Sequence, residues 1–114
     1  MRWPLWRVAV TEQSMEPTLL PGDWLLVRRS VQAGRPIRIH PGQLVVTRHP
    51  ERPAMLLVKR AARWERGGWW LVSDSNSAGA VDSRRFGPAA PDLVEGRVLW
   101  RYRPLRRAAG SVRR

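Results

Sequence analysis

Short apolar stretches that alternate with polar positions run through this chain, and no long stretch repeats with the 3.6-residue period of a helix. Alternation of this kind predicts β-strands. We expect six of them, at Arg7–Val10, Trp24–Arg29, Gln43–Arg48, Ala54–Arg60, Trp69–Ser73 and Arg97–Arg103. The sequence therefore predicts a mainly β fold.

Turn-forming residues separate the predicted strands, for example Pro21-Gly22-Asp23 and Pro41-Gly42. The pair Gly67-Gly68, which stands between two apolar stretches, predicts a hairpin. The segment from Ser73 to Asp92 shows no alternation and is rich in Ser, Gly, Asp and Pro. A long loop without its own structure in a compact domain is typical of a segment that serves a functional site.

Lys59 is the single lysine among 21 basic residues, so the other 20 are arginines. It ends the apolar run that begins at Met55, and strand alternation puts Met55, Leu57 and Lys59 on one face. Both faces of this strand are apolar near its middle, which predicts a central, covered strand. Burial disfavours the ammonium form and lowers the pKa of a lysine, so Lys59 is a candidate base.

Ser14 is the candidate nucleophile for such a base. It follows the first predicted strand and precedes the turns at Pro17 and Pro21, where it can be exposed and rigid, with its backbone N–H free to face an oxyanion. A serine hydroxyl needs a neighbouring base to take its proton. His40 and His49 both precede prolines and lack metal-ligand spacing, so we expect neither a histidine base nor a metal site.

The length of 114 residues suits one small domain. We predict a single catalytic domain over residues 1–104 and a basic, disordered tail over residues 105–114. The absence of cysteine excludes a disulfide framework. We expect no cofactor.

The net charge of +12 predicts attraction to nucleic acid or anionic lipid. One alternative is therefore a small basic β-barrel that binds nucleic acid through Trp100-Arg101-Tyr102-Arg103. Because that alternative leaves Lys59 and Ser14 unexplained, we expect no specific nucleic acid partner. No apolar stretch reaches the ~18 residues of a transmembrane helix, so we expect a cytoplasmic protein. Trp3 and Trp6 beside arginines leave open a peripheral contact with an anionic membrane.

Several segments occur in the order found in type I signal peptidases. Ser14 to Asp23 resembles the nucleophile box, Pro41 to Val46 the next box, Leu57 to Arg60 the general-base box, and Asp74 to Gly87 the last box. With Val94-Glu95-Gly96-Arg97-Val98, the resemblance covers roughly residues 8 to 104.

The resemblance implies a small, coiled, mostly antiparallel β-sheet or partial barrel of the signal peptidase catalytic-core type. It also implies that Ser14 is acylated, that Lys59 is the general acid and base, and that Asp23, Asp82 and Arg84 support the site, with an ion pair between Asp82 and Arg84. The substrate would lie as an extended strand along Thr11–Gln13 and Pro53–Leu57. Its expected contacts are Thr11, Gln13, Met15, Met55 and Leu57.

The chain departs from the family pattern at three places that bear on the site. Glu12 stands where a serine often donates to the oxyanion, and a carboxylate there would repel that charge unless it turns away or backbone N–H groups suffice. Ala80 stands where a serine commonly orients the lysine, so we expect either that Ser77 or a backbone carbonyl replaces it or that the base is held more loosely. Asp74-Ser75-Asn76 replaces the usual Gly-Asp-Asn.

Short family members without a membrane anchor resemble the maturation proteases of nickel-type superoxide dismutase. This resemblance implies that the chain removes an N-terminal propeptide from a precursor protein, with the nickel superoxide dismutase precursor as the candidate partner. General signal peptide processing is the alternative within the family. A self-cleaving regulator of the repressor type is less favoured, because no small-residue cleavage site with room to fold back precedes Ser14.

Overall fold

The computed structural model describes residues 4–32, 35–75 and 80–103. Its elements are β1 (Leu5–Ala9), β2 (Trp24–Arg29), β3 (Val31–Gln32), β4 (Arg35–Pro36), β5 (Leu44–His49), β6 (Arg52–Glu65), β7 (Gly68–Val72), α1 (Ser83–Phe86), η1 (Pro91–Leu93) and β8 (Val94–Tyr102). The predicted mainly β class is confirmed, and helix in the described part is limited to the single turns α1 and η1. No described helix is long and apolar enough to cross a membrane.

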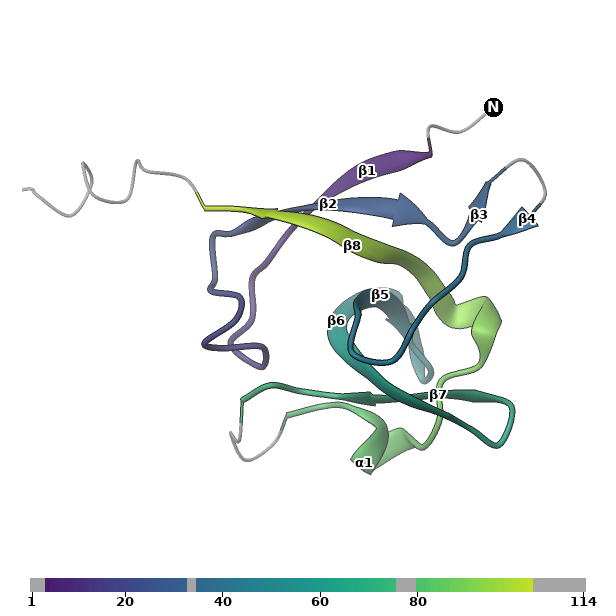
Figure 1. Ribbon diagram of the computed structural model, residues 1–114. Coiled ribbons are helices and arrows are strands. Elements are labelled where there is room, and N and C mark those ends of the chain that lie inside the picture. Colours follow the sequence, from purple (N-terminus) through teal and green to yellow (C-terminus); the bar gives the residue numbers. More distant parts are fainter. Residues whose placement is uncertain (1–3, 33–34, 76–79, 104–114) are drawn as a thin grey trace, which may run out of the picture.

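Six strands form one antiparallel sheet in the order β1-β2-β8-β5-β6-β7, and β3 pairs with β4 (Figure 1). The sheet does not close into a barrel, because its end strands β1 and β7 are not paired with each other. One backbone edge of β1 therefore has no strand partner in the described part of the chain. The first half of β6 has a similar open edge, since β7 pairs only with residues 60–65.

The hydrophobic core lies on both faces of β5. Val46 packs on one face with the residues that follow β1 and with β2, in a cluster of Val10, Met15, Leu19, Leu25, Val27 and Val46. Val45 packs on the other face, in a cluster of Val45, Ala61, Leu71, Ala89 and Val94. Two adjacent valines thus anchor two halves of the molecule, as alternation along a covered strand requires.

The turns lie at the predicted glycine and proline positions, except that one hairpin turn is displaced by one residue. Asp23 N–H donates to the Leu20 carbonyl at 3.0 Å across Pro21 and Gly22, and the φ of 96° at Gly22 fits a type II turn. The β6–β7 hairpin turns at residues 66 and 67, one residue earlier than predicted, and both have positive φ. Gly68 instead begins β7, where a Cβ would lie 2.5 Å from the Ala89 carbonyl oxygen.

Two predictions about the second half of the chain were wrong. β6 is 14 residues long, and its first five residues are exposed, so it is covered only over residues 57–62. The exposed first five residues lie beyond the pairing with β7, which begins at Arg60. The segment from Ser73 to Asp92 contains α1 and the start of η1. Asp82 starts α1, because its carboxylate accepts a hydrogen bond from the N–H of Arg84. The predicted tail over residues 105–114 and Trp3 lie outside the described residues.

Candidate active site

Ser14 lies on a loop over residues 10–23 that connects β1 to β2. The ends of the loop are joined by a hydrogen bond of 2.8 Å from the Val10 N–H to the Asp23 carbonyl. Asp23 is fully buried and forms an ion pair with Arg103 at 2.9 Å. Burial alone would raise the pKa of Asp23, but the hydrogen bond from Arg103 and its charge lower that pKa below its usual value. Asp23 therefore ties the base of the loop to Val10 and Arg103.

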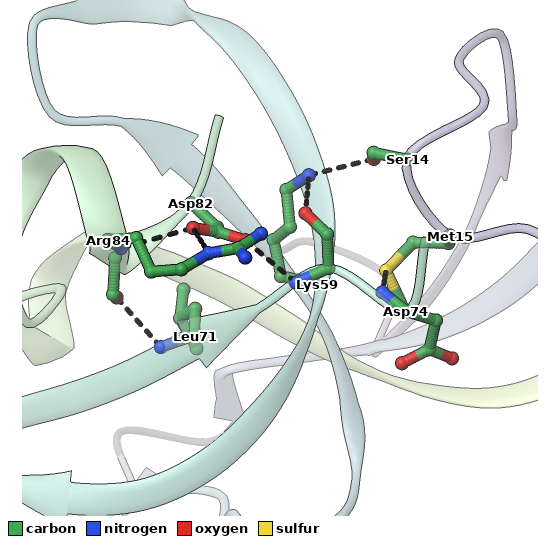
Figure 2. A network of polar contacts seen from close by, with 9 residues as sticks. Ser14, Met15, Lys59, Leu71, Asp74, Asp82 and Arg84 are labelled. Carbon is green, nitrogen blue, oxygen red and sulfur yellow. Dashed lines mark hydrogen bonds and ion pairs between the residues drawn. The ribbon is translucent and has the colours of Figure 1, made fainter. Parts of the chain in front are cut away.

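Lys59 Nζ lies 2.7 Å from Ser14 Oγ and 3.0 Å from Ser73 Oγ, and donates to both in its ammonium form (Figure 2). Lys59 is 1% exposed. Burial lowers the pKa of Lys59 from its ordinary value, while the charges of Glu12 and Asp82 oppose this shift. The structure thus brings together the two residues that the sequence singled out, 45 positions apart.

Ser73 is the site residue that the sequence analysis missed. It was expected to be the last residue of a strand, while Ser77 or a carbonyl was expected to orient Lys59. Ser77 lies outside the described residues. The predicted hairpin held no signal for Ser73, because pairing counted back from the observed turn places Asp74 opposite Lys59, and only a bulge in β6 brings Ser73 there.

Asp82 connects Arg84 to the segment that carries Ser73. Its carboxylate accepts hydrogen bonds from the Arg84 guanidinium at 2.9 and 3.1 Å and from the Ser73 N–H at 2.9 Å. Burial alone would raise the pKa of Asp82, but these hydrogen bonds outweigh burial and hold the pKa at about 2. The expected ion pair between Asp82 and Arg84 is present, and it fixes the backbone that positions Ser73.

Asp74 joins the Ser14 loop to β6. Its carboxylate accepts a hydrogen bond of 2.6 Å from Thr18 Oγ1 and forms an ion pair of 2.7 Å with Arg60. Its N–H points at Met15 Sδ at 3.4 Å, a contact drawn in Figure 2. The hydrogen bond from Arg60 is the main reason that the pKa of Asp74 is lowered. The residue that departs from the family's Gly-Asp-Asn thus braces the loop.

A cleft of about 200 Å³ opens beside Ser14, between the open edges of β1 and β6. The described residues that line it are Val8, Ala9, Val10, Thr11, Glu12, Ser14, Met15, Leu56 and Val58. Thr11 and Met15 were expected there. Gln13, Met55 and Leu57 do not line it. Leu57 lies on the opposite, buried face of β6 with Lys59, which leaves Leu56 and Val58 to face the cleft.

The Ser14 N–H donates a hydrogen bond to no residue of the described part, so it is free to face a bound group in the cleft. His49 lies away from this cleft, buried against Phe86 with 5.8 Å between the ring centroids. Within residues 4–32, 35–75 and 80–103, no three His, Cys, Asp or Glu side chains gather as a metal site would require.

Comparison with known proteins agrees with this geometry. Residues 5–91 match the model of the Peptidase S24-like family. The chain is 34% identical to mitochondrial ATP-independent inner membrane protease subunit 1b of Arabidopsis thaliana, over 80% of this chain and 66% of the relative. It is 30% identical to mitochondrial inner membrane protease subunit 1 of Xenopus tropicalis, over 81% of this chain and 65% of the relative. The match thus spans slightly less than two thirds of each relative, and the chain belongs to the Peptidase S24-like family.

Proposed function

We propose that this protein is a serine endopeptidase of the signal peptidase type, with Ser14 as nucleophile and Lys59 as general acid and base. The observation that carries the proposal is the 2.7 Å contact between Lys59 Nζ and Ser14 Oγ beside an open cleft. Burial of Lys59 favours its neutral amine, to which the serine hydroxyl donates in place of the ammonium contact.

In the proposed reaction Lys59 takes the proton of Ser14 as Oγ attacks the scissile carbonyl. The oxyanion faces the Ser14 N–H, and Lys59 then gives its proton to the leaving amine. Lys59 then takes a proton from the water that attacks the acyl-serine, and returns it to Ser14 Oγ as the new carboxylic acid is released and ionises. Ser73 accepts a hydrogen bond from the amine throughout and keeps it aimed at Ser14.

The open edges of β1 and β6 favour an extended peptide as substrate, because an added strand would pair with backbone groups on both sides of the cleft. The relatives are named as mitochondrial inner membrane proteases, which favours a precursor protein as substrate. Within that class we propose removal of an N-terminal propeptide in a cytoplasmic setting. The nickel superoxide dismutase precursor is the specific candidate, on the sequence resemblance, and general signal peptide processing is the alternative.

The test is peptide-bond cleavage by wild type, Ser14→Ala and Lys59→Met, where methionine keeps the length of lysine without its amine. The panel holds Ala-x-Ala peptides and a nickel superoxide dismutase precursor that carries its propeptide. We expect cleavage by wild type alone, with all three proteins showing the same circular dichroism spectrum. Turnover by folded Lys59→Met would contradict the lysine base, and a wild type that cleaves nothing would contradict the peptidase.

A further inference from the structure

Glu12 gives the cleft beside Ser14 a single negative charge. Among the described lining residues, it alone has an ionisable side chain. The others are apolar or carry a hydroxyl, and Val10, Leu56 and Val58 form much of the wall. A carboxylate among apolar groups interacts with a bound charge more strongly than one on an open surface, because a substrate that fills the cleft displaces water.

Most carboxylates elsewhere in the molecule form ion pairs with arginine. Of nine acidic residues, five form ion pairs with arginine: Asp23, Glu65, Asp74, Asp82 and Glu95. Glu12 forms no ion pair with any residue of the described part, although the chain has 20 arginines. Its side chain is exposed on the cleft side and close enough to Lys59 for its charge to act on that amine. Its charge is therefore available to a bound substrate.

On the basis of the proposed peptidase function, we propose that Glu12 is a specificity-determining residue that binds a basic side chain of the substrate beside the scissile bond. The methylene stem of a lysine or arginine would pack along Val10 and Leu56, with its charged end at the carboxylate. The same contact offsets the repulsion between Glu12 and an oxyanion at Ser14. A basic substrate side chain therefore lowers the electrostatic repulsion that Glu12 would otherwise exert on the transition state.

The test compares matched peptides that carry arginine or citrulline, its uncharged isostere, at each of the two positions on either side of the scissile bond. The readout is the ratio of kcat/KM for the two peptides. At one position we expect wild type to prefer arginine about fivefold, the size of a partly shielded ion pair. The ratio should fall to about one in Glu12→Gln, and Glu12→Lys should prefer glutamate to glutamine at that position.

Glu51→Gln is the matched control, because Glu51 is exposed in the turn between β5 and β6 and does not line the cleft. It should keep the wild-type ratio. Glu12 also affects the pKa of Lys59. Because Lys59 acts on both peptides, this effect cancels in the ratio of their kcat/KM values. A ratio that is the same in wild type and Glu12→Gln at every position would overturn the inference.

Binding of the same peptides to Ser14→Ala separates this inference from the proposed function. An arginine preference in Kd that depends on Glu12 supports the specificity role even if wild type cleaves nothing. Equal Kd values for arginine and citrulline, together with equal kcat/KM ratios, overturn the role while leaving the peptidase intact.

Discussion

Ser73 Oγ accepts a hydrogen bond of 3.0 Å from Lys59 Nζ because the pairing of β6 with β7 shifts by one residue between Ala61 and Arg63. Arg63 pairs with Trp70 on the turn side of this bulge. If that register continued, Asp74 would stand opposite Lys59. A bulge inserts one residue into one strand, and here it places Ser73 there instead.

The bulge has an electrostatic consequence. A carboxylate next to Lys59 would favour its ammonium form and raise its pKa, which would oppose its role as a base. Asp74 lies instead beside Arg60, the neighbour of Lys59 on the other face of β6, at 2.7 Å. The one-residue shift therefore gives the amine a neutral hydroxyl partner and gives the arginine the carboxylate.

Ser73→Ala is expected to lower kcat by roughly 10- to 100-fold with little change in KM, because Lys59 loses the partner that aims it at Ser14. Ser73→Thr keeps the hydroxyl and should retain most of the activity. Steady-state kinetics on one cleaved peptide measure both. Equal kcat for wild type and Ser73→Ala would show that Lys59 needs no orienting hydroxyl.

Ser73→Asp tests the charge beside the amine. The new carboxylate should stabilise the ammonium form of Lys59, so the rise of kcat/KM with pH should move to higher pH. Ser73→Asn is the uncharged control of similar size. Coincident pH profiles for the two variants would contradict this account of the bulge.

The wild-type pH profile has a predicted direction. Because burial lowers the pKa of Lys59, kcat/KM should rise with pH and level off above that folded value, below the range of an exposed lysine. The charge of Glu12 raises the same pKa, so Glu12→Gln should shift the rise to lower pH. A profile that is flat across this range would argue against a lysine base.

The sequence was informative about the strands and the two central residues, because alternation and an isolated lysine depend on local patterns. It was less informative about Ser73 and the expected contacts Gln13, Met55 and Leu57. Ser73 owes its position to a bulge in β6, and Met55 and Leu57 do not line the cleft because it lies on the other face of that strand. Neither property follows from composition or periodicity, since tertiary pairing decides both. The sequence marks Glu12 as a departure from the family pattern, but only the structure shows that it lines the cleft.

Thr18→Val should lower kcat about tenfold, because it removes the 2.6 Å hydrogen bond that ties the Ser14 loop to Asp74. Valine has nearly the shape of threonine, so the change removes the hydroxyl and little else. The free energy of unfolding should fall by about 1 kcal/mol. Thr18→Ser keeps the bond and should match wild type. An unchanged kcat in Thr18→Val would show that the loop is held by its other contacts.

Asp82 should make the fold sensitive to acid over a defined range. Its folded pKa of about 2 lies below the ordinary 3.8, so its contribution to stability is present above about pH 4 and is lost as pH falls towards 2. The shift corresponds to roughly 2 kcal/mol. We expect Asp82→Asn to be destabilised at neutral pH and to lose less stability than wild type between pH 4 and pH 2.

Urea unfolding followed by tryptophan fluorescence at a series of pH values measures this difference. The control is Asp92→Asn, since Asp92 is an exposed residue in η1. Its stability should follow that of wild type across the whole series. Because Asp82 holds Ser73 through the Ser73 N–H, Asp82→Asn should also lower kcat in the range where it stays folded. Parallel stability curves for wild type and Asp82→Asn from pH 7 to pH 2 would contradict the low pKa of Asp82.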